Sequence, residues 1–267
     1  MEPAFVITAA LVLSGLMILA WVVQRLTGKS GWVDTIWSLA VGIGGVLASV
    51  WPEAGAITGR RIAVGILIAL WALRLAGHIA ARTRGGEDDP RYADLARQWG
   101  RLFPLYLFGF LQIQAAAALV LVLAVRLAAI HPGPFPVVGD YLGLALLVIA
   151  VVGEGIADGQ LARFARANSG RKAVCDVGLW AWSRHPNYFF EWLGWCAWAV
   201  VAIDVSGTWP WGWAALAAPL LMYVLLAYVS GVPPLEAHML KSRGDAFRAY
   251  QARVNAFFPG PQHKEDA

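Results

Sequence analysis

Charged residues are scarce in this chain of 267 residues: Asp, Glu, Lys and Arg make up only 14%, whereas they make up about 25% of soluble domains. Hydrophobic residues make up 59%, and the mean hydropathy is +0.59. Apolar runs of about twenty residues recur, and each is long enough to cross roughly 30 Å of hydrocarbon. This composition excludes a soluble domain. It predicts an all-α, polytopic membrane protein, since membrane barrels are built from short alternating segments.

Cysteine is also scarce, with only Cys175 and Cys196. The sequence has no CxxC motif and no Cys/His cluster, so it predicts neither a metal site nor a disulfide framework. Neither a GxGxxG nor a Walker A pattern is present, which excludes a nucleotide held on a Rossmann fold or a P-loop. No internal repeat or low-complexity segment is visible, and one membrane-embedded domain is expected over residues 1–267.

Seven apolar stretches predict seven transmembrane helices. Tryptophans near the ends of several stretches are typical of the membrane–water interface. The expected spans cover residues 5–26, 32–51, 62–80, 104–127, 137–156, 188–203 and 213–231.

Basic residues predict the orientation of these spans. With the N-terminus outside, 17 of the 21 Lys and Arg residues fall on the cytoplasmic side and 3 fall in outer loops. The remaining one, Arg74, lies within a span. The C-terminal tail, residues 232–267, is therefore expected in the cytoplasm. The pI of 9.3 and net charge of +4 reflect this asymmetry, and no nucleic-acid partner is predicted.

Ionisable side chains within the spans are candidates for function, because a charge in hydrocarbon is costly. Asp34 begins the second span, and the pairs Arg74/His78 and Glu154/Asp158 each have the i,i+4 spacing of one helix face. All lie toward the cytoplasmic half, which indicates a polar cavity that opens to the cytosol. The alternative is that these groups neutralise one another, for example Asp34 with Arg74.

The stretch "SRHPNYFFEW" predicts an anion site at a helix start. Pro186 suits the first turn of a helix, whose free N–H groups and dipole favour an anion. Arg184 and Asn187 would add donors, and Glu191 follows Asn187 by one helical turn. A carboxylate there would accept hydrogen bonds from an amide or a ribose hydroxyl. We therefore predict a nucleotide site, although basic residues just upstream also suit anionic lipid headgroups.

The tail begins with two prolines and predicts one or two amphipathic helices at the interface. Its polar residues would close over the loop that precedes Pro186. These residues are Glu236, His238, Lys241 and Arg243.

Three segments resemble a family of membrane reductases related to steroid 5α-reductases, in a largely uncharacterised bacterial branch. They are "WALRLAGHIAARTRGGEDDPRY" followed by "FGFLQIQ", then "CDVGLWAWSRHPNYFFEWLGW", and "PPLEAHMLKSRGDAFRAYQARVNAFFP". The likeness extends over residues 32–259. The combined pattern is specific, whereas "RHPNY" alone is not.

The resemblance implies a monomeric reductase of seven helices in the bacterial inner membrane, with NADPH bound on the cytoplasmic side. The reaction would reduce a carbon–carbon double bond conjugated to a ketone in a steroid-like or other lipophilic substrate drawn from the membrane lipid. The implied cofactor-binding residues are Glu154, Asp158, Arg166, Arg171, Lys172, Trp180, Arg184, His185, Asn187, Tyr188, Glu191, Glu236, His238, Arg243 and Tyr250.

Such a reaction also needs a donor that polarises the substrate carbonyl. In the steroid enzymes a glutamate of the second helix and a tyrosine of the third form this pair. The present chain departs from that pattern, with Asp34 in the second span and Ile79 after His78 where the resemblance leads one to expect tyrosine. Asp34, His78 and the nearest tyrosine, Tyr92, are the catalytic candidates. A second departure is Phe190, where the family more often has glycine.

Two other classes remain open. Membrane methyltransferases that use S-adenosylmethionine carry a similar "RHP…Y" turn and a later glutamate, matched here by residues 184–188 and Glu236. Those enzymes tend to be shorter and to have fewer spans. A transporter or a lipid-binding protein is the other alternative, but the sequence shows neither the repeats nor the broken helices typical of transporters.

Overall fold

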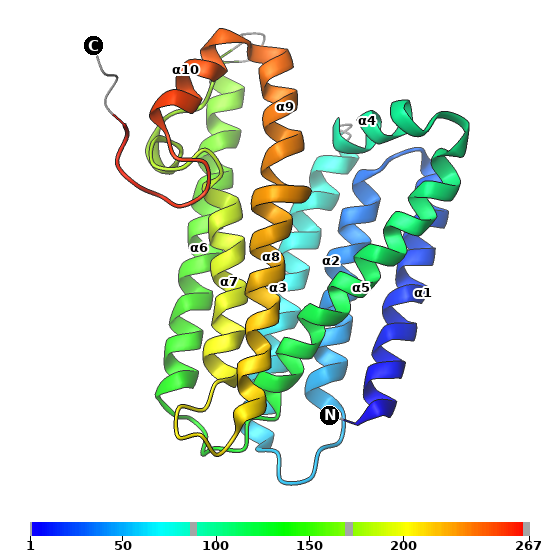
Figure 1. Ribbon diagram of the computed structural model, residues 1–267, viewed down its shortest axis with the longest axis vertical. Coiled ribbons are helices and arrows are strands. Elements are labelled where there is room, and N and C mark those ends of the chain that lie inside the picture. Colours follow the sequence, from blue (N-terminus) through cyan, green and yellow to red (C-terminus); the bar gives the residue numbers. More distant parts are fainter. Residues whose placement is uncertain (1, 86–89, 169–172, 264–267) are drawn as a thin grey trace. The chain divides into compact units, whose positions relative to one another are not determined.

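The computed structural model describes residues 2–85, 90–168 and 173–263, which fold into helices without any strand within these ranges (Figure 1). Short 3₁₀ segments and one π-helical segment, labelled η, interrupt or join the α-helices. The elements are α1 Pro3–Thr27, α2 Gly31–Val50, α3 Thr58–Arg84, α4 Pro90–Trp99, η1 Gly100–Leu102, α5 Phe103–Ala129, α6 Val138–Ala167, η2 Gly178–Ala181, α7 Pro186–Ala202, η3 Pro210–Leu216, α8 Ala217–Val224, η4 Leu225–Val229, α9 Val232–Arg243 and α10 Asp245–Arg253.

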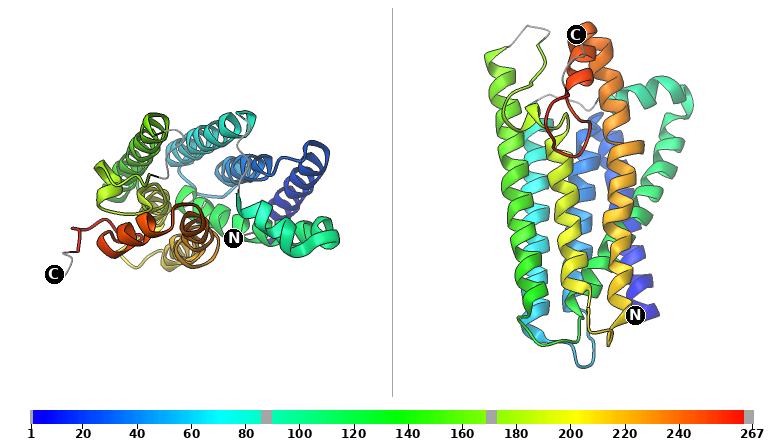
Figure 2. Two further views of the ribbon diagram at one scale, coloured as in Figure 1. Left: turned by 90° about the horizontal axis from the view of Figure 1, so that it is seen from above. Right: turned by 60° about the vertical axis from the view of Figure 1, so that its left-hand side comes forward.

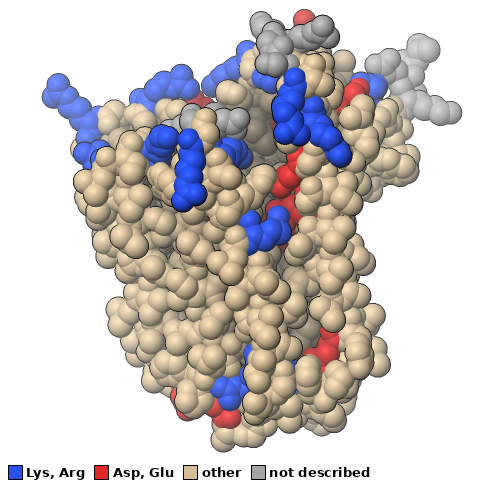
Figure 3. Space-filling view, turned by 180° about the vertical axis from the view of Figure 1, so that it is seen from behind, with Lys and Arg blue, Asp and Glu red and all other residues tan. Residues whose placement is uncertain are grey.

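Six helical stretches are long and apolar enough to cross a membrane, which confirms a helical membrane protein. They are Pro3–Thr27, Gly31–Val50, Thr58–Arg84, Arg91–Ala129, Val138–Ala167 and Pro210–Arg243. Uncharged residues form a broad surface along the helices (Figure 3). The expected span at 188–203 is the helix α7, which has 17 residues. Seven spans and the side on which each terminus lies stay predictions.

The residues group into two compact units by their contacts, and the expected single domain is not tested by this grouping. Unit 1 comprises Met1–Leu142 with Trp198–Ala218, and unit 2 comprises Gly143–Ala197 with Pro219–Ala267.

Helix α2 is the centre of unit 1, where it packs against α1, α3 and α5 (Figure 2). Glycines make this close packing feasible. A Cβ atom on Gly42 would lie 2.3 Å from the side chain of Ala72 on α3, and one on Gly44 would lie 2.6 Å from Val122 on α5. Small residues that let helix backbones approach closely are typical of helix pairs in membranes.

Two arginines counted as outer-loop charges are instead buried in unit 1. Arg60 is 0% exposed, binds both carboxylate oxygens of Asp140 and donates to three loop carbonyls. Arg126 is 1% exposed, binds Glu53 and donates to the carbonyl of Ala48, near the end of α2. Both residues satisfy carbonyls that a helix end or a loop leaves unpaired. Their charges therefore serve the fold.

In unit 2, Phe190 of α7 lies against Gly153 of α6. The tail forms the two helices α9 and α10, which confirms the expectation of one or two helices there. Phe247, Tyr250 and Val254 form a small buried core beneath α10. The last expected span, 213–231, lies within the apolar stretch Pro210–Arg243. This stretch is not one regular α-helix, because it includes the 3₁₀ segment η3, α8 and the π-helical η4. Helix α4, which is short and polar, was not expected from the sequence.

Candidate functional site

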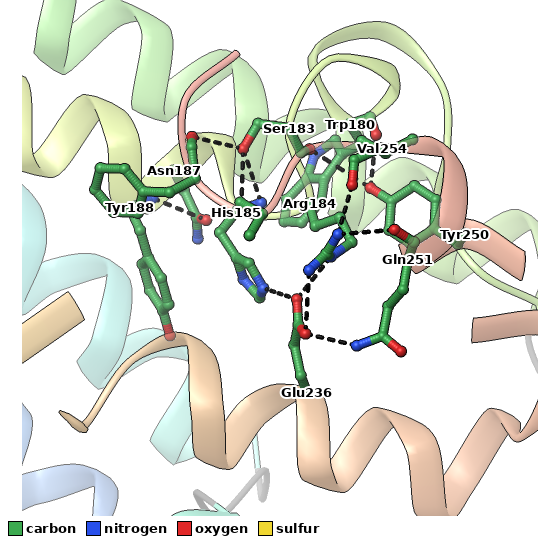
Figure 4. A network of polar contacts seen from close by, with 12 residues as sticks. Trp180, Ser183, Arg184, His185, Asn187, Tyr188, Glu236, Tyr250, Gln251 and Val254 are labelled. Atoms are coloured by element: carbon green, nitrogen blue, oxygen red, sulfur yellow. Dashed lines mark hydrogen bonds and ion pairs between the residues drawn. The ribbon is translucent and has the colours of Figure 1, made fainter. Parts of the chain in front are cut away.

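The turn before α7 is the centre of a polar network in unit 2 (Figure 4). Pro186 begins α7, as predicted, and places Ser183, Arg184 and His185 just before its first turn. The remaining members come from α9, α10 and the segment that follows α10. We call this arrangement the Arg184–Glu236 network.

Arg184 joins three parts of unit 2. Its Nε donates to Glu236 Oε1 at 2.7 Å, and its Nη2 donates to Glu236 Oε2 at 3.3 Å. Its Nη1 donates to the carbonyls of Gln251 and Val254. The geometry is a two-pronged arginine–carboxylate pair with extra backbone acceptors. All three side-chain nitrogens of Arg184 are thus bound within the protein, so the arrangement favours a positioning role over phosphate binding.

Glu236 of α9 is the common acceptor of the network. It accepts hydrogen bonds from the guanidinium of Arg184, from Nε2 of His185 at 2.9 Å and from the side-chain amide of Gln251 at 2.6 Å. Both carboxylate oxygens are in use. Sequence reasoning placed Glu236 near the nucleotide but missed Gln251, which no motif marks.

His185 combines deep burial with one unpaired ring nitrogen. The residue is 3% exposed, and within the described part of the chain its Nδ1 has no hydrogen-bond partner. Burial lowers the pKa of His185, against the opposing effect of the Glu236 carboxylate. The ring is therefore neutral near pH 7 and donates from Nε2, which leaves Nδ1 as a buried acceptor. Such an atom is suited to a ligand that brings an N–H or O–H group.

Amide and carboxylate groups of α6 and α7 meet beside this turn. Asn187 donates to the carboxylate of Asp158 at 3.3 Å, so the two side chains face each other. Glu154 is buried, one turn earlier on α6. Glu191 accepts a hydrogen bond from Trp195 of its own helix at 2.9 Å, so part of its hydrogen-bonding capacity is used within α7.

Phe190 lies against Gly153 of α6. A Cβ atom on Gly153 would come within 2.4 Å of the phenyl ring. The ring thus takes up space that the missing side chain of Gly153 leaves, next to Glu154. Phe190 was noted as a departure from the glycine of the family, and the structure shows that its partner is Gly153, which was not singled out from the sequence.

Two predicted residues of this region serve the fold. The Tyr250 hydroxyl donates to the carbonyl of Trp180 at 2.6 Å, and the indole of Trp180 donates to the carbonyl of Ala157 at 2.9 Å. Burial raises the pKa of Tyr250, so its hydroxyl keeps its proton. This chain of bonds fixes η2 against α6 and α10.

The other predicted residues surround the network less closely. Arg166 is exposed at the end of α6, and the ring of Tyr188 stacks on that of His185 at 5.5 Å. His238 is half-buried on α9, and Arg243 donates to Ser242 at 2.9 Å. Arg171 and Lys172 lie outside the described residues.

A second polar cluster lies in unit 1 and joins two of the three catalytic candidates. The Tyr92 hydroxyl donates to Asp34 Oδ1 at 2.9 Å, and Arg91 donates to Asp34 Oδ2 at 2.7 Å. Gln114 approaches the Tyr92 oxygen at 3.5 Å, and its own Oε1 is buried with no partner among the described residues. The third candidate, His78, is exposed on α3.

This cluster shows which residues contact Asp34. Asp34 and Tyr92 come from α2 and α4, which are 58 residues apart at this point. Arg91 had been counted only as a loop charge, and it pairs with Asp34. Across the described residues, no group of three or more His, Cys, Asp and Glu is arranged to hold a metal ion.

Comparison with known proteins gives a family but no activity. The family model described as "Protein of unknown function (DUF1295)" matches residues 20–254. An uncharacterised protein of Schizosaccharomyces pombe is 23% identical, in an alignment that covers 90% of this chain and 75% of the relative. No solved structure matches.

Proposed function

Because the chain belongs to the DUF1295 family, which is related to steroid 5α-reductase-like membrane proteins, we propose that it is an NADPH-dependent reductase. Its reaction is the reduction of a carbon–carbon double bond conjugated to a ketone in a lipophilic substrate. When bound, NADPH supplies the hydride that the β-carbon of this substrate accepts.

The observation that carries this proposal is the bond between Tyr92 and Asp34. As the β-carbon is reduced, negative charge builds on the ketone oxygen, and a hydrogen-bond donor fixed at that oxygen lowers the barrier. Tyr92 is 3% exposed, and a phenol in such a dry site is a stronger donor than one in water. In the structure Tyr92 donates its one hydroxyl proton to Asp34. When substrate binds, the hydroxyl would turn that proton toward the ketone, while Asp34 of α2 and Gln114 of α5 hold the phenol in place. An aspartate–tyrosine pair would thus take the place of the glutamate–tyrosine pair that the resemblance implies, with the tyrosine supplied by α4.

The residues of unit 2 fit the nicotinamide nucleotide. The buried Nδ1 of His185 is an acceptor, the Asn187 amide is both donor and acceptor, and the Asp158 carboxylate lies beside that amide. These groups complement the amide and ribose hydroxyls of the cofactor. Arg166, exposed at the end of α6, is suited to the phosphates. In this assignment Arg184 and Glu236 position the turn and do not contact the cofactor.

The proposal includes a membrane topology. The 17 residues of α7 rise about 25 Å, so α7 would cross most of the hydrocarbon as a seventh span. The N-terminus would then lie outside and the tail in the cytoplasm, where NADPH is available. We propose a monomer in the bacterial inner membrane that acts as a single domain.

Ligand-dependent melting of the purified protein in lipid nanodiscs tests the cofactor. NADPH is expected to raise the melting temperature, because it binds the folded state alone, and S-adenosylmethionine is not. The variant N187A should lose the NADPH-dependent rise while it keeps the melting temperature of the free protein. D245A, on the exposed surface of α10, is the matched control and should keep the rise.

Enone reduction, measured as the loss of NADPH absorbance with a Δ4-3-ketosteroid as probe, tests the donor. Y92F and D34N are expected to lower kcat about a hundredfold while NADPH still stabilises both variants. A kcat of Y92F equal to that of the natural protein would refute the role of the phenol.

The bond between Arg184 and Glu236 supports a second candidate function, that of a membrane methyltransferase. It joins the two features that such enzymes share, the "RHP…Y" turn and the later glutamate. Stabilisation by S-adenosylmethionine and not by NADPH would favour that reading over a reductase.

A further inference from the structure

A pocket of about 440 Å³ lies within unit 2, and its lining includes none of the residues assigned to the cofactor or the substrate above. We call it the aromatic pocket. Its walls come from α8, η4, the first residue of α9 and the segment that follows α10. They are formed by Tyr223, Ala227, Tyr228, Asn255, Phe257 and Phe258, with Val232, Ala256 and Pro259 between them. The volume lies within the range of about 300–1,000 Å³ that is usual for small-molecule sites.

A π-helical turn builds one wall of the pocket. In an α-helix, residues five apart point about 140° away from each other. In η4 the wider turn is marked by the bond from Ser230 N to the carbonyl of Leu225, at 2.7 Å. Tyr223 and Tyr228 are thereby brought together, with ring centroids 5.5 Å apart and hydroxyl oxygens 3.3 Å apart. Such π-turns are frequent at functional sites.

The opposite wall is held by its backbone. Ser183 donates to the carbonyl of Phe257 at 2.9 Å, and the N–H of Arg184 donates to the carbonyl of Asn255 at 2.8 Å. The side chains of this segment therefore remain available to the pocket. The ring of Phe257 lies 5.2 Å from that of Tyr223 in an edge-to-face contact. The pocket is thus pre-formed, which reduces the entropy cost of binding a ligand.

The lining restricts the chemistry of the occupant. All the lining residues lie in the described part of the chain, and none of them is charged. An anionic headgroup would lose its water there without a cation in return. The polar groups are two phenol hydroxyls and one amide, whose Oδ1 bonds to His263 at 2.9 Å. They suit one neutral hydroxyl or carbonyl at the end of an apolar body.

The surroundings indicate where such a molecule comes from. Leu220, Val224 and Tyr228 are spaced one turn apart and are 65%, 47% and 65% exposed. They belong to a stretch, Pro210–Arg243, that is apolar and long enough to cross a membrane. This exposed stripe therefore faces lipid chains, and it leads to the pocket because Tyr228 is part of both.

We propose that the aromatic pocket binds a neutral membrane lipid, with its apolar body against the aromatic rings and its hydroxyl or carbonyl end at Tyr223 and Tyr228. This binding requires neither NADPH nor reductase activity, so it stands or falls independently of the proposed reaction.

Photolabelling in nanodiscs tests the proposal with two matched probes. One is a diacylglycerol that carries a diazirine in an acyl chain, and the other is the phosphatidic acid with the same chains. They differ only in whether a neutral hydroxyl or a charged phosphate ends the molecule. Without NADPH, the diacylglycerol is expected to label the peptides of residues 220–232 and 254–259 at least about fivefold more than the phosphatidic acid does, since the phosphate would be buried without a partner.

Variants locate the label. A227W fills the pocket and should abolish labelling of these peptides, whereas A145W, an equal change at an exposed position of α6, should not. The double variant Y223F/Y228F keeps both rings and should reduce the labelling by the diacylglycerol about fivefold. It carries the test if A227W fails to fold, as judged by its elution volume and melting temperature.

Three results would overturn the proposal. They are equal labelling by the two probes, labelling that neither A227W nor Y223F/Y228F reduces, and crosslinks from these peptides to a second copy of the chain in place of lipid.

Discussion

Replacing Glu236 by alanine removes the acceptor shared by Arg184, His185 and Gln251. Breaking a buried ion pair by removing one partner costs about 3–5 kcal/mol, because the other charge stays buried and unpaired. The side chains of Arg184 and Glu236 are each 12% exposed, and that of His185 is 4% exposed. Water therefore replaces the lost acceptor only in part. For a chain of this size each kcal/mol corresponds to roughly 2–4 °C in melting temperature, so E236A should melt about 10 °C lower.

The chain contains a control of the same kind at its surface. Asp245 and Arg248 form an i,i+3 ion pair whose side chains are 95% and 69% exposed. Such exposed pairs contribute about 0–1 kcal/mol, so D245A should shift the melting temperature by no more than about 2 °C. Both variants are compared by thermal unfolding in the same detergent at pH 7.5.

A conservative change separates charge from packing. E236Q keeps the size of the side chain and one acceptor oxygen, but it directs an N–H group toward donors of the network. We expect E236Q to melt between the natural protein and E236A. Equal shifts for E236A and D245A would refute the reasoning, since they would show that the network adds no more stability than a solvated pair.

Further predictions rest on single contacts. Burial holds the pKa of His185 below its ordinary 6.5, so the unfolded chain takes up the proton first and stability should fall as the pH drops below about 6.5. Between pH 7.5 and pH 5 the melting temperature of H185Q should therefore fall less steeply than that of the natural protein. Parallel curves for the two proteins would contradict a neutral histidine. G153A should lower the free energy of unfolding by about 1–3 kcal/mol, because its Cβ would lie 2.4 Å from the ring of Phe190. Adding F190L to G153A should recover part of the loss, and an unchanged stability of G153A would contradict the contact. R60M should strongly reduce the yield of folded protein, because it leaves the buried carboxylate of Asp140 uncompensated; R97M, at an arginine that is 75% exposed, is the control and should express normally.

Local patterns predicted much of the helical architecture. Apolar runs located helices near 5–26, 32–51, 62–80, 104–127 and 137–156, because a segment in lipid must bond its own backbone groups. The start of α7 followed from Pro186, whose fixed backbone angle favours a first helical turn. The i,i+4 spacing of Glu154 and Asp158 likewise put both on one face of α6. Each of these inferences uses residues that are close in sequence.

Contacts between segments that are distant in the chain were not predicted from the sequence. Asp34 and Tyr92 were singled out separately, but their hydrogen bond spans 58 residues and depends on α4, a helix too short and polar to register as a span. Arg184 and Glu236 were both expected near a nucleotide, whereas their bond to each other, across 52 residues, is the basis of the positioning role that we propose for them.

The sequence by itself determined that this is a helical membrane protein with ionisable groups toward one end of its helices, because hydropathy and helix periodicity are properties of neighbouring residues. The tertiary structure decided which of those groups meet, which arginines are buried as helix-end partners, and that the last span widens into a π-turn at Tyr223 and Tyr228. The physical reason is that a polar side chain in an apolar surrounding must find a partner, and only the packing of helices distant in sequence determines which partner is within reach.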